Sequence, residues 1–168
     1  MNREFKDAIE NSPIIAAIKN DAELHQCLTC DSRVIFILYG DICNIADIVD
    51  TVKSAGKIAL VHLDLISGLN AKEIAVDFIK KYTRADGIIS TRPQLIRHAK
   101  ELSLYTVMRF FVIDSMAYDN IEKQLHAVRP DFIEILPALM PKVISRICDL
   151  SPVPIIASGL ISDKEDVM

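Results

Sequence analysis

The sequence lacks any long apolar run and any secretory signal pattern, although 51% of its 168 residues are hydrophobic. Its apolar stretches are far shorter than the roughly 20 residues that a bilayer-spanning helix needs. Residues 2–4 lead into a mixed polar segment and not into the apolar region of a signal peptide. We therefore expect a globular protein with no membrane segment and a cytoplasmic location.

Cysteine is also scarce, with four residues in the chain. Cys27 and Cys30 have the spacing of a redox or zinc pair, but no second pair follows at ligand spacing. The residues after Cys30 also lack a thioredoxin-like context. We expect both thiols near the end of a helix, in a structural role, and we expect no metal and no cofactor.

Basic residues form no dense run. The chain carries 19 Lys and Arg against 23 Asp and Glu, a net charge of −4, which provides no overall attraction for nucleic acid. No aromatic series interleaves with the basic residues, so solvated helix faces explain most of them. RNA binding would need a local basic patch or the combined surface of an oligomer. The candidates are Lys80, Lys81, Arg84, Arg92, Arg97, His98, Lys100, Lys142 and Arg146.

Seven short apolar runs recur along the chain with nearly constant spacing. Their ends lie 21 to 26 residues apart, which is the length of a strand, a helix and two loops. Strands that alternate with helices form βαβ units on a parallel sheet, and seven such units predict a TIM-type (β/α)8 barrel. The runs are 13–19, 34–40, 58–64, 87–90, 105–114, 132–137 and 154–159.

The predicted barrel is one domain, residues 1–168, with its eighth strand and last helix missing from this sequence. The length is below the roughly 200 residues at the lower end for this fold. After residue 160 only the opening of a helix follows. The alternative is a seven-stranded open sheet, which would leave an unpaired strand edge.

Helix starts fit between the strands. Residues 5, 8 and 9 predict a short leading helix that covers the bottom of the barrel. Asn20 or Asp21, Asn44, and Asp114 or Ser115 are suited to cap helices, and Pro93 and Pro141 to first-turn positions. Two further starts resemble capping boxes. These are Asn70 with Glu73, ahead of a buried stripe at 74, 78 and 79, and Ser162 with Glu165; Thr91 is expected to cap the helix at Pro93.

Four charged residues interrupt or end the apolar strands, and in a barrel such groups lie at a mouth or are paired. Lys19 and Arg109 are suited to hold an anion, while Asp64 and Glu134 are suited to orient hydroxyls. The alternative is a structural ion network, for example between Arg109 and Glu134. His62 is expected to be a satisfied interior histidine, not a catalyst.

The sequence Ser158-Gly159-Leu160 ends the seventh run. Small residues let backbone N–H groups approach a phosphate closely, and barrels often bind phosphate after strands seven and eight. A turn of small residues can equally be a tight loop that binds no ligand. The prediction of a phosphate site therefore depends on the position of this turn after the seventh strand.

Six segments resemble the glycerol uptake operon antiterminator regulatory family, in order and over essentially the whole chain. The resemblance implies a bacterial cytoplasmic regulator whose barrel senses glycerol 3-phosphate and acts on the leader mRNA of glycerol-metabolism genes. Two departures are Ser158, where the family has the first of two glycines, and the absence of the family's C-terminal strand. The segments are KIALVHLDLISGLN (57–70), TRADGIISTRP (83–93), MRFFVIDS (108–115), PIIAAIK (13–19), IEILP (133–137) and PIIASGLI (154–161).

The sequence therefore predicts a transcription antiterminator, not an enzyme, whose ligand is glycerol 3-phosphate and whose partner is an mRNA leader. The ligand would be held by Lys19, Asp64, Arg109, Glu134, Ser158, Gly159 and Leu160. One alternative is a barrel enzyme of isomerase, lyase or aldolase type, because the fold hosts many chemistries. Another is a metabolite sensor with protein partners. The sequence also leaves open a homo-oligomer whose subunits combine their basic patches into one RNA-binding surface.

Overall fold

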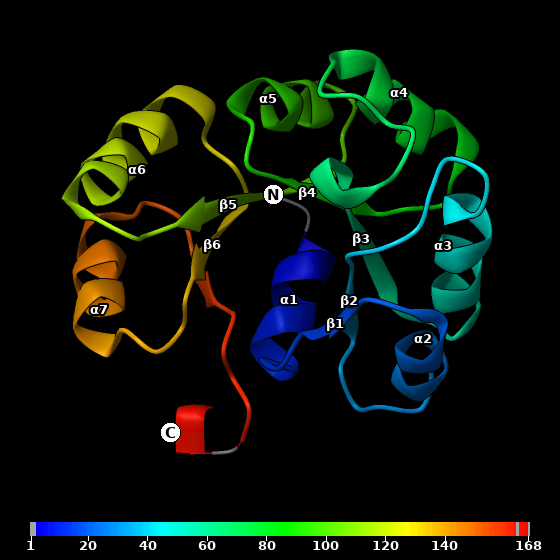
Figure 1. Cartoon of the computed structure of the whole chain (residues 1–168), viewed down its shortest axis with the longest axis horizontal. Coiled ribbons are helices and arrows are strands. Elements are labelled where there is room, and N and C mark those ends of the chain that lie inside the picture. The colour runs from blue at the N-terminus through cyan, green and yellow to red at the C-terminus, as the bar shows by residue number, and fades with distance from the viewer. Residues whose placement is uncertain (1–2, 164, 168) are drawn as a thin grey trace.

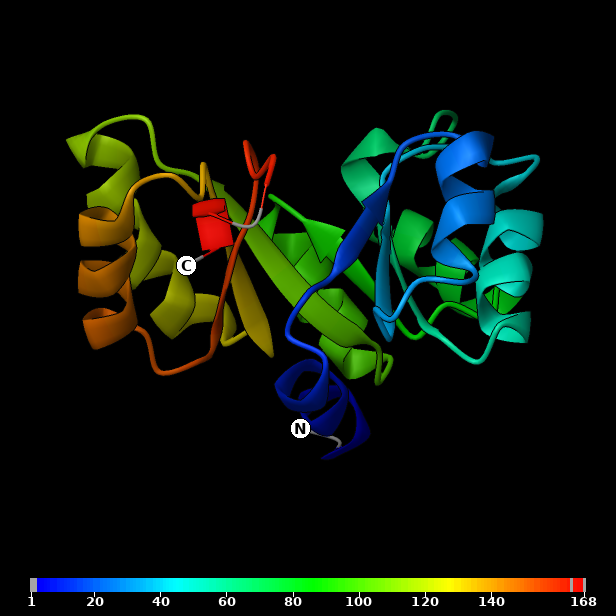
Figure 2. The same cartoon turned by 90° about the horizontal axis from the view of Figure 1, so that it is seen from below.

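The computed structural model describes residues 3–163 and 165–167 and has a curled parallel sheet with helices on its outer face (Figures 1 and 2). The sheet follows the chain order β1 to β7, and each described neighbouring pair is parallel. The strands are β1 (Ala16–Ile18), β2 (Val34–Ile37), β3 (Ile58–His62), β4 (Gly87–Ser90), β5 (Tyr105–Phe111), β6 (Phe132–Leu136) and β7 (Ile155–Ala157).

The helices follow the strands as the βαβ pattern predicts. A short 3-10 helix, η1 (Leu63–Leu65), follows β3, and another, η2 (Glu165–Val167), follows β7. The α-helices are α1 (Arg3–Asn11), α2 (Asp21–Cys27), α3 (Ile45–Ser54), α4 (Glu73–Tyr82), α5 (Pro93–Glu101), α6 (Ser115–Val128) and α7 (Pro141–Leu150). None of them, in the described part of the chain, has the length and apolar character that a bilayer crossing requires.

All seven predicted strands are present, and the TIM-like α/β fold is confirmed. Among the described residues, β1 pairs only with β2 and β7 pairs only with β6, so the sheet is open between these two edges. The carboxyl ends of all seven strands lie at one end of the curled sheet (Figure 2). Loops that follow different strands therefore meet there.

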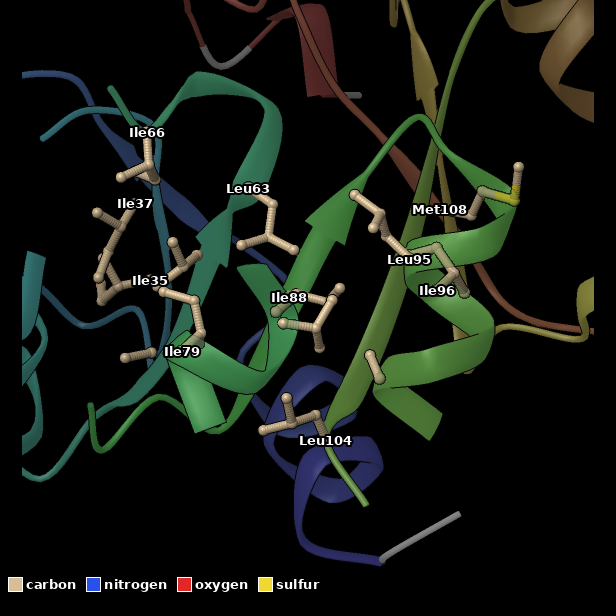
Figure 3. Close-up of a cluster of buried hydrophobic side chains, with 14 of the residues drawn as sticks. Ile35, Ile37, Leu63, Ile66, Ile79, Ile88, Leu95, Ile96, Leu104 and Met108 are labelled. Carbon is tan, nitrogen blue, oxygen red and sulfur yellow. The ribbon is translucent and has the colours of Figure 1, made fainter. Parts of the chain in front are cut away.

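Alternating side chains of the strands build two cores. On β3, Ile58 and Leu60 belong to the interior cluster, whereas Ala59 and Val61 belong to the cluster under the helices. This two-residue alternation is the pleat of a strand that is buried on both faces. Figure 3 shows part of the outer cluster, where residues such as Ile88 and Ile96 pack between the sheet and the helices.

Helix α1 closes the end of the sheet at which the strands begin, as its spacing predicts (Figure 2). Phe5 is fully buried and stacks on Tyr105 at a ring-centroid distance of 4.5 Å. It also meets Phe132 edge-on at 5.0 Å. Tyr105 and Phe132 are the first residues of β5 and β6, so the helix seals the bottom of the interior core.

Several helix starts match the sequence prediction. The side chains of Asn20 and Asp114 accept hydrogen bonds from the backbone N–H groups of Glu23 and Ala117, at 2.9 and 2.7 Å. Pro93 and Pro141 occupy the first turns of α5 and α7.

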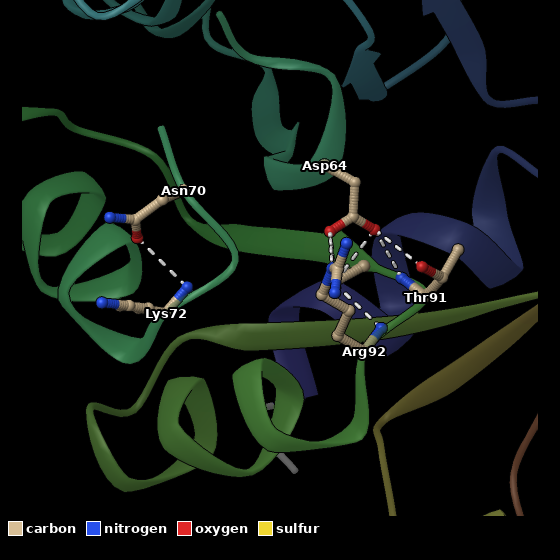
Figure 4. Close-up of polar contacts among 6 residues, drawn as sticks. Asp64, Asn70, Lys72, Thr91 and Arg92 are labelled. Carbon is tan, nitrogen blue, oxygen red and sulfur yellow. Dashed lines mark hydrogen bonds and ion pairs between the residues drawn. The ribbon is translucent and has the colours of Figure 1, made fainter. Parts of the chain in front are cut away.

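Other helix starts differ because short polar side chains bond elsewhere. Asn44 precedes α3, but its Oδ1 accepts from the N–H of Asp41. The predicted box of Asn70 with Glu73 is wrong, since Asn70 accepts from the N–H of Lys72 (Figure 4). Thr91 is predicted to cap α5, but Arg92 is the residue that precedes this helix.

Two more local predictions fail. Ile74 is 63% exposed and lies outside the buried stripe of α4. The predicted capping box of Ser162 with Glu165 is not formed in the described part of the chain. Asp166 instead accepts hydrogen bonds from the Ser162 N–H and hydroxyl, at 2.7 and 2.8 Å. Residue 164, within that predicted helix start, lies outside the described residues.

Replacing Phe5 with Ala removes the ring that seals the interior core, and we expect a loss of about 3–5 kcal/mol in the free energy of unfolding. Urea unfolding followed by circular dichroism measures it. Asp7→Ala, on the exposed side of the same helix, should change stability by less than about 0.5 kcal/mol. Equal effects of the two substitutions would show that α1 does not seal the core.

Candidate functional site

The interior of the sheet becomes polar toward the carboxyl ends of the strands. Buried apolar residues fill its lower part, as is usual inside such barrels. Two residues further along β3, β5 and β6, on the same face, the side chains are polar and still buried. These pairs are Leu60 with His62, Val107 with Arg109, and Phe132 with Glu134.

Arg109 and Glu134 form a buried, bidentate ion pair. They are register partners on β5 and β6, with side chains 8% and 1% exposed. The Nε of Arg109 donates to Glu134 Oε2 at 2.6 Å, and its Nη2 donates to Oε1 at 3.0 Å. The structural ion network that the sequence left open is therefore present, and it lies beneath the mouth of the curled sheet.

Ser158 extends this network to the loop after β7. Its hydroxyl donates to Glu134 Oε1 at 2.6 Å, and its backbone N–H donates to the carbonyl of Ile135 at 3.0 Å. The Ser158 N–H is thus engaged within the sheet and is not free for a phosphate. A hydroxyl at this position fixes the loop to the ion pair, which a glycine could not do.

Gly159 and Leu160 follow with unusual backbone conformations, at φ values of +81° and +61°. Leu160 is a non-glycine residue in the left-handed region, where L-residues are uncommon. The residue is 71% exposed. Within the described part of the chain, the N–H groups of these two residues have no hydrogen-bond acceptor, while the Gly159 carbonyl accepts from Ala138 N–H at 3.2 Å.

Lys19 stands at the opposite edge of the opening, directly after β1. Its backbone N–H donates to the Glu23 carboxylate at 2.7 Å, and the residue is exposed. Its ammonium group forms no ion pair with any residue that the structure describes. It is therefore available for an anion.

Asp64, in η1, is bound to the loop between β4 and α5 (Figure 4). Its carboxylate accepts from the Ser90 hydroxyl at 3.0 Å, and from the Thr91 N–H and hydroxyl at 2.8 and 3.0 Å. The Nε of Arg92 lies 3.4 Å away, and the Asp64 side chain is 16% exposed. Asp64 thus holds the β4–α5 loop, a role that sequence reasoning missed because Thr91 was expected to cap α5.

His62 is interior, as predicted, but it is not satisfied. It is 3% exposed, and its Nδ1 has no hydrogen-bond partner among the described residues. Burial of the ring, and to a lesser extent the positive charge of Arg109, lowers the pKa of His62 to about 4, while Asp64 acts in the opposite direction. The imidazole is therefore neutral at physiological pH.

The cysteine pair lies at the end of α2, as expected. The Cys30 thiol donates to the Cys27 carbonyl at 3.2 Å, and the Nζ of Lys57 donates to the Cys30 carbonyl at 2.7 Å. All four thiols are free. No cluster of His, Cys, Asp or Glu in the described part of the chain has the arrangement of a metal site.

Acidic side chains pair with two of the basic residues on and near α4 and α5. Arg84 lies 3.7 Å from Asp50, and His98 lies 2.9 Å from Asp77. Hydrogen bonds to Asp77 and Glu101 raise the pKa of His98. These two basic residues are therefore paired within the protein.

Breaking the buried ion pair should cost more than removing it. We expect Glu134→Leu alone to lower the free energy of unfolding by about 3–5 kcal/mol, because Arg109 is left as an unpaired buried charge. Adding Arg109→Met should restore part of that loss. A double-mutant cycle by urea unfolding measures the coupling, and additive losses would contradict it.

Stability should fall on the acid side because of His62. Unfolded His62 takes up a proton near pH 6.5, whereas the folded residue does so near pH 4, so the loss develops as pH falls between these values and reaches about 3 kcal/mol. Urea unfolding of wild type and His62→Asn from pH 7 to pH 4 should show a shallower acid decline in the variant. His126→Asn, on exposed α6, should retain the wild-type slope.

Comparison with known proteins identifies relatives over nearly the whole chain. An uncharacterized protein of Escherichia coli, YgcP, is 41% identical over 158 residues, which cover 94% of this chain and 83% of that protein. A glycerol uptake operon antiterminator regulatory protein from Listeria monocytogenes has 33% identity and a TM-score of 0.87, covering 91% of this chain and 83% of its own.

A glycerol uptake operon antiterminator-related protein from Thermotoga maritima has 33% identity and a TM-score of 0.79, covering 90% of this chain and 85% of its own. The family model of the glycerol-3-phosphate responsive antiterminators matches residues 14–168. That match includes every strand, the buried ion pair and the loop after β7. The chain belongs to the glycerol-3-phosphate responsive antiterminator family.

Proposed function

We propose that this protein is a glycerol 3-phosphate-responsive antiterminator that acts on leader mRNA in the cytoplasm. The observation that carries the proposal is the family match over residues 14–168, which includes the mouth where hydrogen-bond donors and a free ammonium group lie. Ligand sites of such barrels lie at the carboxyl ends of the strands. The same family favours a regulator over the alternative of a barrel enzyme.

The phosphate would bind at the open side of the sheet. Gly159 and Leu160 offer two backbone N–H groups that the sheet does not use, and Lys19 offers a positive charge from the other edge. Backbone N–H groups and ammonium groups are the usual partners of a phosphate. Ser158 would support this loop through its hydroxyl and would not donate its N–H to the phosphate.

The glycerol part would lie over the polar interior. Glu134 and Arg109 form the floor, and a carboxylate oxygen retains capacity for a further hydrogen bond from a hydroxyl. Asp64 would contribute at the rim, although its oxygens already hold the β4–α5 loop. Ligand binding would fix the loops at the mouth and so raise the affinity for RNA.

Binding of RNA is tested with a leader that contains a transcription terminator. Fluorescence anisotropy with and without glycerol 3-phosphate should show tighter binding with the ligand, and the affinity should fall as salt rises. An RNA without the terminator sequence is the control. Size-exclusion chromatography of the complex would show whether two chains share one RNA. Unchanged RNA affinity on ligand addition would overturn the proposed response.

Lys19→Ala should weaken glycerol 3-phosphate binding about tenfold or more, because a charge-assisted hydrogen bond is lost. Isothermal titration calorimetry measures the affinity. Lys6→Ala is the matched control, since Lys6 is an exposed lysine on α1, at the opposite end of the sheet. Equal affinities for the two variants would remove Lys19 from the phosphate site.

A further inference from the structure

The polar side chains inside the sheet, near the carboxyl ends of the strands, are hydrogen-bonded to one another with one exception. Arg109, Glu134 and Ser158 form a connected chain of hydrogen bonds. His62 lies on the same interior face, one alternation above Leu60, and pairs in register with buried Ile89. Its Nδ1 is the buried side-chain nitrogen or oxygen that has no partner among the described residues.

An unpartnered histidine is an unusual choice for this position. Interior layers of such barrels are filled mainly by Val, Ile and Leu, and the residue below His62 is a leucine. A buried polar atom with no partner destabilises the folded state, and such atoms are rare in folded proteins. Packing alone therefore favours an apolar residue here, and the histidine needs another reason.

The chemistry of the ring identifies the kind of group that it suits. The burial of the ring and the neighbouring charge of Arg109 lower the pKa of His62 to about 4, so the imidazole is neutral and offers one donor and one acceptor. A neutral ring has no charge with which to attract a phosphate. A hydroxyl group, which also donates and accepts, is the matching partner.

We propose that His62 recognises a hydroxyl group of a small phosphorylated polyol, and that it thereby distinguishes the polyol phosphate from free phosphate. This inference rests on the proposed function, because it assumes a ligand whose phosphate lies near Gly159, Leu160 and Lys19. The site is then divided between an anion-binding rim and a floor that reads hydroxyl groups. The carboxylate of Glu134 lies in the same floor.

The test compares two probes, glycerol 3-phosphate and inorganic phosphate, by isothermal titration calorimetry on wild type and two variants. His62→Phe keeps a ring of similar shape and removes both nitrogens, so glycerol 3-phosphate should bind about tenfold more weakly. Its phosphate affinity should stay within about twofold. His62→Asn keeps a donor and an acceptor near the position of Nδ1 and should recover part of the lost affinity.

Controls separate recognition from folding. Circular dichroism and thermal unfolding show that each variant is folded at the assay temperature, and His126→Phe, on exposed α6, should bind both probes as wild type does. Equal weakening of both probes by His62→Phe, or no weakening of either, would overturn the inference and leave the proposed function standing. Failure of wild type to bind glycerol 3-phosphate would overturn both.

Discussion

A charged group buried inside a parallel sheet needs a partner, and Arg109 and Glu134 meet this constraint across adjacent strands. Their bidentate contact ties β5 to β6, and the Ser158 hydroxyl continues it to the loop after β7. These bonds cross the part of the sheet that leads to its open edge. The ion pair therefore sets the position of the loop whose two following N–H groups face no acceptor in the described chain.

Apolar burial in the lower half of the molecule offsets the free-energy cost of burying the ion pair in the upper half. Apolar interior residues from β2 to β6, sealed by Phe5 of α1, supply the burial that stabilises the sheet. In the described part of the strands, the buried polar residues of the interior face lie near the carboxyl ends, where the mouth is close. This division between an apolar lower part and a polar upper part follows from the geometry of the barrel. The loops after every strand meet at the upper end, whereas the helices on the outer face lead the chain back to the lower end.

Periodicity was sufficient to predict the strands, their order and the helix at the bottom, because buried parallel strands are continuous apolar runs at regular intervals. The strand assignment also placed Arg109 and Glu134 on adjacent strands. It was not sufficient for the hydrogen bonds of short polar residues, which choose among several nearby groups once the loops are packed. Asp64 accepts from Ser90 and Thr91, and the Ser158 N–H bonds to Ile135, and neither partner is visible in the spacing of the sequence.

The electrostatics of the interior support the proposed division between a rim that binds an anion and a floor that binds hydroxyl groups. Two donors of the buried Arg109 guanidinium are directed to Glu134, and burial together with the charge of Arg109 keeps His62 neutral. The pair as a whole carries no net charge. In the proposed site, a phosphate would gain more from Lys19, which has no ion-pair partner among the described residues, and from the N–H groups after Ser158. Because Ser158 is bonded to Glu134, a ligand that contacts this floor would also act on the loop of the proposed phosphate site. This connection would let the whole ligand, and not its phosphate alone, fix the mouth.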